Sequence, residues 1–288
     1  MSDTLAAKAA DSVKEEAALL PPVDVVEDIQ GITLYADLPG VASVLEVGVR
    51  GRSAADAVRR CALQWIQQQA LAHFAQRVTT LRSRMPAAQA LPVPTLALSN
   101  ARTLWGSCTR DHHIKLNWRL FLLPETLIDY VVAHELAHQW WGQAVGGRNY
   151  HEQWLSEGFA QYFAALYAQK AHGDGLFADM LRQFRRWALS ESDQGPVYLG
   201  YRLGHVRNDS RVFRALVYNK GALVLHMLRR LVGDDVFFRA LRRFYTDYKF
   251  VKAGTPDLER AFEAESGQTL DRFFERWIYG SDIPRVRY

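Results

Sequence analysis

The sequence predicts an α/β (α+β) fold in which a small mixed sheet precedes a mainly helical half, and three observations predict it. Apolar and polar residues alternate within 23–50, 95–99 and 113–122, which is the period of half-buried strands. Apolar residues recur at helical spacing over 53–84, and helical patterns dominate from Gly173 onward. The 288 residues are 49% hydrophobic and 23% charged, a balance typical of a soluble globular protein with a substantial core.

The first elements have clear local signals. Gly31 and Pro39-Gly40 mark turns, so residues 23–50 are expected to form two or three strands. Ser53 is the expected N-cap of the helix 53–84. The apolar residues that recur at roughly helical spacing in this segment are Val58, Leu63, Ile66, Leu71 and Phe74.

The elements that follow surround one strongly patterned helix. Strands 95–99 and 113–122 flank the loop 102–108, RTLWGSC. Pro124 then leads into a helix that carries HELAHQWW. After the break VGGRN, a second apolar helix begins near Glu152, which we interpret as a solvated residue at a helix start.

A metal-binding pattern lies in the first of these two helices. His134-Glu135-Leu136-Ala137-His138 fits the pattern H-E-x-x-H. Positions i and i+4 share a helix face, so both imidazoles can point at one ion, and the glutamate can reach a water on that ion. The alternative is two partly buried helix histidines and a solvated glutamate. The apolar surroundings in YVVAHELAHQWW favour a helix buried under an active site.

A candidate third ligand follows in the second helix. The 18 residues 139–156 separate His138 from Glu157, which lies among apolar residues in HEQWLSEGFAQYFAALY. A carboxylate in such a segment needs a partner, and a metal ion supplies one. Tyr218 lies farther along, in RVFRALVYNKGALVLHML, at the start of a strongly apolar helix.

These motifs extend over the second half of the chain as HELAHQWWGQAV, NYHEQWLSEGFAQY and VYNKGA, and the ending is AGTPDLERAFEAESGQTLDRFFERWIYGSDIP. Together they resemble the gluzincin metallo-aminopeptidases of the aminopeptidase N and leukotriene A4 hydrolase type. The resemblance runs from about residue 130 to the C-terminus. It implies a thermolysin-like zinc peptidase core with one Zn²⁺ per chain. It also implies that Glu157 is the third ligand and that the Tyr218 hydroxyl stabilises the oxyanion.

The chemistry expected of such a site is peptide hydrolysis. Two neutral imidazoles and one carboxylate leave the zinc ion an open coordination position, where a water is acidified. Glu135 is the expected general base, which takes the proton of this water and later passes it to the leaving amine. Zinc and Tyr218 meet the developing oxyanion. The expected substrate is a peptide or a protein, paired in extended form with strand 113–122 as the sheet edge.

The segment before the metal helix departs from the aminopeptidase pattern. The G-x-M-E-N strand, whose glutamate binds the free amino terminus of the substrate in that family, is missing from the sequence. Residues 57–138, with WGSC and LNWRL, are instead similar to the YgjP-like zinc metallohydrolases, in which the third ligand is a histidine. His151 is the candidate for that role here. A YgjP-like hydrolase is therefore the alternative, and exopeptidase and endopeptidase activity both stay open.

A third resemblance covers the first strands. Residues 21–41, PPVDVVEDIQGITLYADLPGV, are similar to the opening of the small heat-shock protein domain. They are too few to form that β-sandwich. A small heat-shock-like holdase is the alternative of a different class, and it would need a complete sandwich but no H-E-x-x-H motif.

Charge and cysteine content weigh against several other classes. The net charge is +4, but arginines recur at helical spacing with apolar residues in LRQFRRW, LRRL and RALRRFY. That pattern favours solvated helix faces, so we expect no nucleic-acid partner. No apolar run is long enough to span a membrane, and Cys61 and Cys108 can form at most one bridge. We therefore expect a cytoplasmic protein without membrane association. Cys108 is interpreted as a buried small residue, and His112 and His113 as turn residues.

The motifs divide the chain into four segments. We expect a flexible tail over 1–20, N-terminal strands and a helix over 21–98, a zinc-binding catalytic core over 99–172, and a helical subdomain over 173–288 that completes the active site. The two zinc-family resemblances meet at the helix that carries H-E-x-x-H.

Overall fold

The computed structural model describes residues 24–28, 31–35, 44–47, 54–85, 89–199 and 209–281. The expected tail 1–20 and the expected turn at Pro39-Gly40 lie outside the described residues. In chain order the elements are β1 (Asp24–Asp28), β2 (Gly31–Tyr35), β3 (Val44–Val47), α2 (Ala54–Arg84), β4 (Thr95–Ser99), β5 (Gly106–Cys108), β6 (His113–Asn117), η2 (Trp118–Leu122), α4 (Glu125–Ala137), β7 (Gly146–Gly147), η3 (Tyr150–Glu152), α5 (Trp154–His172), α6 (Asp174–Ser190), η4 (Ser192–Gln194), α8 (Ser210–Phe213), η6 (Arg214–Lys220), α9 (Gly221–Val232), α10 (Asp234–Tyr248), β8 (Lys252–Ala253), α11 (Thr255–Ser266), α12 (Asp271–Phe274) and η7 (Glu275–Tyr279).

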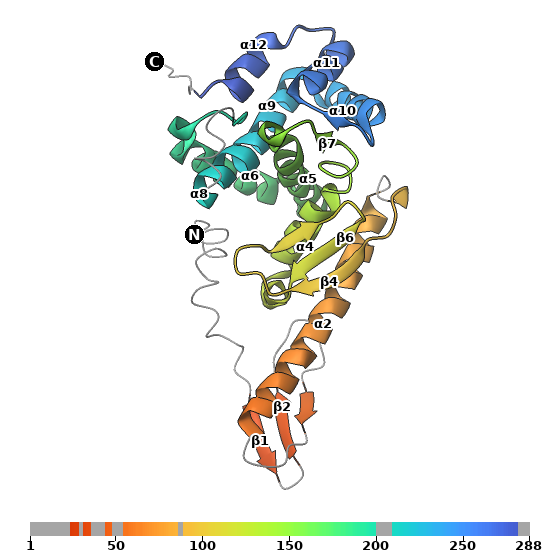
Figure 1. The fold of residues 1–288 in the computed structure, drawn as a ribbon, viewed down its shortest axis with the longest axis vertical. Helices are drawn as coiled ribbons and strands as arrows, with labels where there is room; N and C mark the ends of the chain where they lie inside the picture. The colour runs from red at the N-terminus through yellow and green to blue at the C-terminus, as the bar shows by residue number, and fades with distance from the viewer. Residues whose placement is uncertain are drawn as a thin grey trace.

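The first three strands form a small antiparallel sheet in the order β1-β2-β3. In Figure 1 this sheet lies at the N-terminal end of α2, away from the rest of the fold. Three strands within 23–50 agree with the alternation of the sequence. The small heat-shock resemblance of residues 21–41 remains a hypothesis.

Helix α2 packs through one stripe of its surface. Residues recurring every three or four positions line that stripe, so it faces the core along more than four turns. The buried residues are Ile66, Ala70, Phe74, Val78 and Leu81. Leu63 and Leu71, which also recur at helical spacing, are each 38% exposed and lie outside this stripe.

A mixed three-stranded sheet in the order β4-β6-β5 follows α2. Strand β6 pairs with β4 in parallel and with β5 in antiparallel orientation. The prediction that 113–122 is one strand at the sheet edge was wrong in two respects. First, β6 is the central strand. Second, it ends at Asn117, whose side chain accepts a hydrogen bond from the Arg119 amide and starts the 3-10 segment η2. Strands β4 and β5 are the two edge strands, and in the described part of the chain no strand pairs with the outer edge of either.

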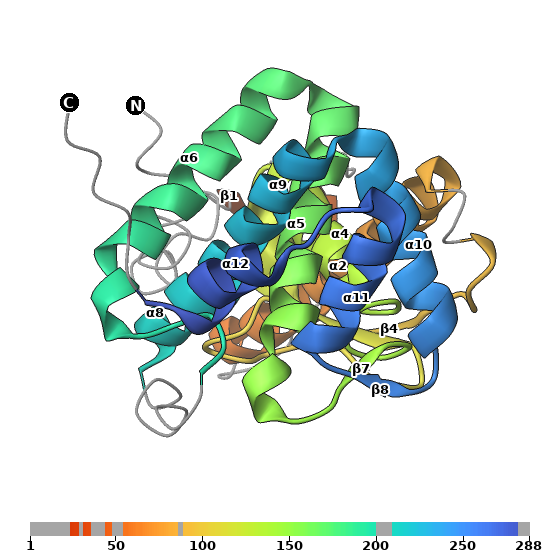
Figure 2. The same ribbon diagram turned by 90° about the horizontal axis from the view of Figure 1, so that it is seen from above.

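The helix that carries HELAH, α4, contacts β5 on one side and α5 on the other. Two hydrophobic clusters meet at α5: one is built from α2, the mixed sheet and α4, and the other from the helices that follow. Figure 2 shows α5 in the middle of the helical half, and α6 and α9 both contact it. The predicted fold class, a small mixed sheet over the metal-binding helix followed by a mainly helical half, is confirmed. No helix of the described residues combines the length and apolar character needed to cross a membrane.

The four-segment division remains a proposal. Strand β4 (Thr95–Ser99) spans its boundary at residue 98 and pairs with β6, so the sheet joins the second and third of the proposed segments.

A buried ion pair fastens α2 to α4. Arg77 Nε and Nη2 donate to the two carboxylate oxygens of Asp129 at 2.7 and 2.6 Å, and Asp129 is 2% exposed. Arg77→Leu leaves this carboxylate buried without its cation, so we expect the free energy of unfolding to fall by about 3–5 kcal/mol. Denaturant unfolding followed by circular dichroism measures the loss. The control is Arg182→Leu, which breaks an exposed pair with Asp179 and should leave the midpoint nearly unchanged. Equal losses in both variants would contradict the prediction.

Candidate metal centre

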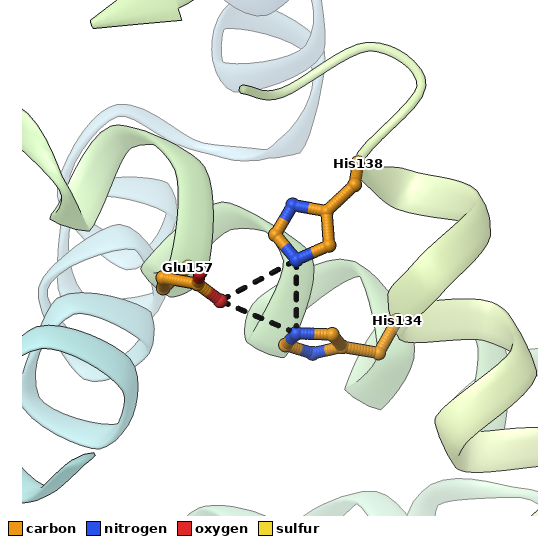
Figure 3. Close-up of side chains that lie close together, drawn as sticks. All are labelled: His134, His138 and Glu157. Atoms are coloured by element: carbon orange, nitrogen blue, oxygen red, sulfur yellow. Dashed lines mark hydrogen bonds and ion pairs between the residues drawn. The ribbon is translucent and has the colours of Figure 1, made fainter. Parts of the chain in front are cut away.

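Three metal-ligating side chains converge where α4 and α5 meet, as Figure 3 shows. The Nε2 atoms of His134 and His138 lie 3.2 Å apart, and Oε2 of Glu157 lies 3.5 Å from the first and 3.4 Å from the second. One donor atom from each residue lies within 4.8 Å of the others, so a single ion can contact all three. The structure thus brings together the three residues that the sequence analysis singled out as ligands.

The two helices place these donors by simple spacing. His134 and His138 are four residues apart at the C-terminal end of α4, so they lie on one face of the helix. Glu157 lies in the first turn of α5, which packs against α4. The side chains of the two histidines are 12% and 10% exposed, and that of Glu157 is 20% exposed. The site is therefore mostly buried, and a small part of each side chain reaches the surface.

His138 is held by groups that the sequence analysis did not identify. Its Nδ1 lies 3.1 Å from the backbone oxygen of Trp141 and 3.2 Å from the Ser156 hydroxyl oxygen. A carbonyl can only accept, so Nδ1 carries the proton in the neutral ring, and the lone pair of Nε2 is left to face the site. Ser156 directly precedes Glu157 in the chain, which is the only sequence signal that could have pointed to it.

The charges at the site favour a cation. Burial opposes ionisation of Glu157. Hydrogen bonds from the two imidazoles, together with their charge, outweigh burial and hold the pKa of its carboxyl far below the usual range. Burial alone would lower the pKa of His138, but hydrogen bonding to Glu157 and the charge of that carboxylate raise it to about 9. Burial lowers the pKa of His134. An ionised carboxylate beside two imidazole lone pairs attracts a proton, and the same attraction acts on a metal ion.

Glu135 is buried beside these three residues. It is 5% exposed, and its Oε2 has no hydrogen-bond partner among the described residues. Burial raises the pKa of its carboxyl to about 7. A buried carboxylate oxygen without a partner costs free energy, so a functional role for it is the natural expectation. A water or a substrate atom at the site would satisfy it.

Gly106 supports Glu135 from the edge strand β5. A Cβ atom built on Gly106 would lie 2.4 Å from Glu135 Oε1 and 2.6 Å from its Cγ. Only glycine lets the strand approach the carboxylate this closely. Sequence reasoning noted Gly106 only as part of WGSC, since its contact with α4 depends on the tertiary fold.

The substitution Gly106→Ala is therefore expected to displace the Glu135 side chain. We expect hydrolysis at the site to fall by about 10-fold to 100-fold, because a shift of about 1 Å in a reacting group can cost that much. Steady-state hydrolysis and metal content, measured on the same samples, test this expectation. Gly175→Ala in α6 is the matched control, since a Cβ atom there meets nothing within 4 Å. Equal activities of the two variants would rule out the contact as important.

Tyr218 approaches the site from the π-helical segment η6. Its ring stacks on that of His134, with 6.0 Å between ring centroids and 5° between the ring planes. Burial and the negative charge of Glu157 raise the pKa of its hydroxyl well above the usual value. The hydroxyl therefore stays protonated and can donate a hydrogen bond to an oxyanion.

His151, the alternative third ligand, is not part of the convergent group. Its ring packs against Tyr198 in a tilted arrangement with 5.3 Å between centroids, and its buried Nδ1 has no hydrogen-bond partner among the described residues. In the described part of the chain, the group of donor atoms around His134 and His138 includes Glu157 and not His151. The geometry favours the carboxylate as the third ligand.

Other residues singled out from the sequence take structural roles. The interpretation of Glu152 as a solvated residue was wrong. It is 4% exposed and accepts hydrogen bonds from the Thr255 amide and hydroxyl, because α11 folds back over the start of α5.

His112 lies in a turn with φ of 57°, and its Nδ1 is 3.0 Å from Gln139 Nε2. Burial raises the pKa of the Cys108 thiol to about 12, which argues against a thiolate nucleophile.

The donor set fits zinc. Two imidazole nitrogens and one carboxylate oxygen form the kind of three-ligand set that catalytic zinc sites use with an open position. The orphaned Oε2 of Glu135 lies beside that set, where a general base is needed. Both the chemistry of the donors and this unsatisfied oxygen are therefore consistent with a resident zinc ion.

Comparison with known families gives two matches that meet at α4. The model of the peptidase family M1 domain matches residues 123–277, and the model of the YgjP-like metallopeptidase domain matches residues 36–141. The overlap of the two ranges contains α4 and both histidines. Both matches agree with the resemblances drawn from the sequence.

Curated relatives carry aminopeptidase names. The chain is 32% identical to aminopeptidase M1 of Arabidopsis thaliana over 54% of its own length, and 26% identical to aminopeptidase N of Lactococcus lactis over 70%. It spans only 18% and 24% of the lengths of these two relatives. These names do not favour the holdase alternative.

Solved structures share the fold. An M1 zinc metallopeptidase from Deinococcus radiodurans superposes with a TM-score of 0.52 and 21% identity, covering 92% of this chain and 52% of that one. Aminopeptidase A of Legionella pneumophila superposes with a TM-score of 0.57 and 22% identity, covering 72% of this chain and 24% of that one.

Proposed function

This chain belongs to peptidase family M1, and from that premise we propose that it is a zinc-dependent peptidase of the aminopeptidase type. The proposed ligands are His134, His138 and Glu157, with Glu135 as the general base and Tyr218 as a hydrogen-bond donor to the oxyanion. One observation carries the proposal: three donor atoms converge beside a buried carboxylate whose second oxygen has no described partner.

The charge of Glu157 and the hydrogen bonds to His138 favour metal binding. Glu157 supplies the negative charge that holds a cation between the two imidazoles, and Trp141 and Ser156 hold His138 in the tautomer that leaves Nε2 free. Zinc, when bound, supplies Lewis-acid chemistry, lowering the pKa of water and polarising a carbonyl group.

The proposed base is Glu135. A carboxyl group whose pKa is raised to about 7 by burial accepts a proton readily near neutral pH and also gives it back. We propose that it takes a proton from the attacking water and hands it to the amine that leaves when the peptide bond breaks. Its orphaned Oε2 leaves one carboxylate oxygen unoccupied for this exchange.

Tyr218 is the proposed hydrogen-bond donor to the negative charge that develops on the former carbonyl oxygen. Because burial keeps its hydroxyl protonated, it can donate a hydrogen bond throughout the reaction. Its ring lies parallel to that of His134, with 6.0 Å between ring centroids, which places it beside a metal ligand.

The proposed substrate is a peptide in extended form along the free edge of β5. This edge offers unpaired backbone groups, and Gly106 brings it against Glu135. Aminopeptidase activity requires recognition of a free amino terminus, and the sequence lacks the G-x-M-E-N strand whose glutamate binds it in that family, so dependence on the free amine is the property to measure. The cytoplasmic location expected from the sequence stays a prediction.

The first test combines metal content with hydrolysis. We expect native mass spectrometry to find about one zinc per chain. We also expect hydrolysis of an amino-acid arylamide that a chelator abolishes and zinc restores. Comparison of a leucine arylamide with its N-acetylated form then measures dependence on the free amine: hydrolysis of the free form alone indicates exopeptidase activity, and equal rates indicate endopeptidase activity. A chain without zinc, or hydrolysis that survives the chelator, would overturn the proposed function.

A further inference from the structure

Three hydrogen-bonded side chains link the elements that carry the metal centre, about one helical turn away from it. The hydroxyl of Tyr130 donates to Oε1 of Gln161 at 2.5 Å, and Nε2 of Gln161 donates to Oδ1 of Asn219 at 3.0 Å. The three residues come from α4, α5 and η6 in turn. These are the three elements that carry His134, Glu157 and Tyr218.

Each of the three side chains is close in sequence to a residue of the metal centre on the same element. Tyr130 is four residues before His134 on α4, and Gln161 is four residues after Glu157 on α5. Residues four apart share a helix face, so both pairs stack along the α4–α5 contact. Asn219 directly follows Tyr218. A hydrogen-bonded layer thus lies about one helical turn away from the layer of functional residues.

These three hydrogen-bonded side chains are largely buried, and a hydrogen bond between buried groups is electrostatically stronger than one exposed to water. Gln161 is 9% exposed and Asn219 is 5% exposed. Burial also raises the pKa of the Tyr130 hydroxyl, so it remains a donor. A buried amide without its partner costs about 1–3 kcal/mol, so alternative rotamers that break this chain are disfavoured.

Two glycines explain why a hydrogen bond is needed here. A Cβ atom on Gly158 would lie 3.1 Å from Gly221 Cα and 3.2 Å from the Val217 backbone oxygen, so α5 touches η6 and the start of α9 backbone to backbone. Such a contact allows close approach but offers no side chain that interlocks, and the elements could rotate or slide against each other. The Gln161–Asn219 bond lies beside this contact and removes that freedom.

The π-helical form of η6 adds a second reason. Seven residues, Arg214–Lys220, adopt this conformation, which is rare and is found frequently at functional sites. The hydrogen bond that Asn219 Oδ1 accepts from Gln161 Nε2 ties this segment to α5 directly beside Tyr218.

We propose that Gln161, Asn219 and Tyr130 are positioning residues that hold Tyr218 in register with Glu157 and His134. The role rests on the proposed function, because Tyr218 matters for catalysis only if the site hydrolyses peptides. The arrangement itself, a hydroxyl aimed by a buried amide pair, has a readout that does not depend on hydrolysis.

The kinetic test uses Asn219→Leu, which keeps the branched shape of the side chain and removes the hydrogen bond. We expect kcat to fall about tenfold with KM changed less than about twofold and zinc content unchanged, since a donor to the oxyanion acts mainly in the transition state. In a Tyr218→Phe background the same substitution should cause no further loss. A loss of equal size in both backgrounds would overturn the proposal.

A control variant separates positioning from general loss of stability. Tyr162→Phe removes another hydrogen bond between α5 and α9, that of the Tyr162 hydroxyl with His226 Nδ1, one residue away from Gln161. We expect it to lower the melting temperature as Asn219→Leu does but to leave kcat unchanged. Should Asn219→Leu fail to fold, Gln161→Met removes the same bond from its other end and carries the same expectations.

The readout independent of activity is fluorine NMR of the metal-free full chain labelled with 3-fluorotyrosine. The Tyr218 resonance is identified by its absence in Tyr218→Phe. We expect it to shift or broaden in Asn219→Leu and in Gln161→Met but not in Tyr162→Phe. If the wild type hydrolyses no peptide, the proposed function fails while this measurement still decides the positioning role. An unchanged Tyr218 resonance in both network variants would overturn it.

Discussion

Glu157→Gln is expected to remove most of the zinc from the chain and to abolish hydrolysis with it. The amide keeps the shape of the side chain but loses the charge that lies 3.4 and 3.5 Å from the two imidazole nitrogens. A neutral carbonyl oxygen is a far weaker ligand for a divalent ion than a carboxylate, and two imidazoles alone hold zinc poorly. We expect affinity to fall by at least about 100-fold, beyond the 10- to 100-fold typical of losing an outer hydrogen bond. Competition with a chromophoric chelator measures it.

The matched control is His151→Ala, which removes the ligand of the YgjP-like alternative. Its ring packs on Tyr198, away from the three converging donors, so we expect full zinc content in this variant. The M1-type site therefore predicts zinc loss in Glu157→Gln only, and the YgjP-like site predicts zinc loss in His151→Ala only. Zinc lost from His151→Ala and retained in Glu157→Gln would place the third ligand at His151 and contradict the M1-type site.

Glu135→Gln is expected to leave zinc in place and to lower kcat/KM by about 1,000-fold or more. General bases contribute about 10²- to 10⁴-fold, and the amide cannot take up the proton of the attacking water. The size and burial of the side chain are preserved, so the packing against Gly106 should survive. Steady-state kinetics with an arylamide substrate, combined with zinc analysis of the same preparation, measures the effect.

The control for this variant is Glu125→Gln at the start of the same helix. Glu125 pairs with Arg77 on the surface and lies outside the metal centre, so its amide variant should retain full activity. Zinc loss in Glu135→Gln would mean that the carboxylate supports the metal and not the proton transfer. Full activity in Glu135→Gln would remove it as the base.

Much of the site could be predicted because its signals are local. Histidines four residues apart on a helix share a face whatever the surrounding fold, and Glu135 follows the first of them. Glu157 was identified by spacing and by its apolar neighbours, and α5 does place it beside the two imidazoles. The helices were equally visible, because amphipathic spacing is a property of each segment alone.

Other features could not be predicted because they depend on pairs of distant segments. The alternation in 113–122 is compatible with a central or an edge strand, and only the pairing with both β4 and β5 makes β6 central. Glu152 reads as a solvated residue until Thr255 folds over it from a segment about 100 residues away. A glycine such as Gly106 carries no sequence signal of the side chain that it will touch.

The sequence by itself therefore determined which elements form and which chemistry they carry, since periodicity and residue type act over a few neighbouring positions. Only the tertiary structure decided the partners: Glu157 and not His151 beside the histidines, β5 as an edge strand beside Glu135, and the hydrogen bonds that link Tyr130, Gln161 and Asn219. Long-range contacts are selected by the packing of whole helices and sheets. Their free energy is shared among many residues, so no single segment encodes them.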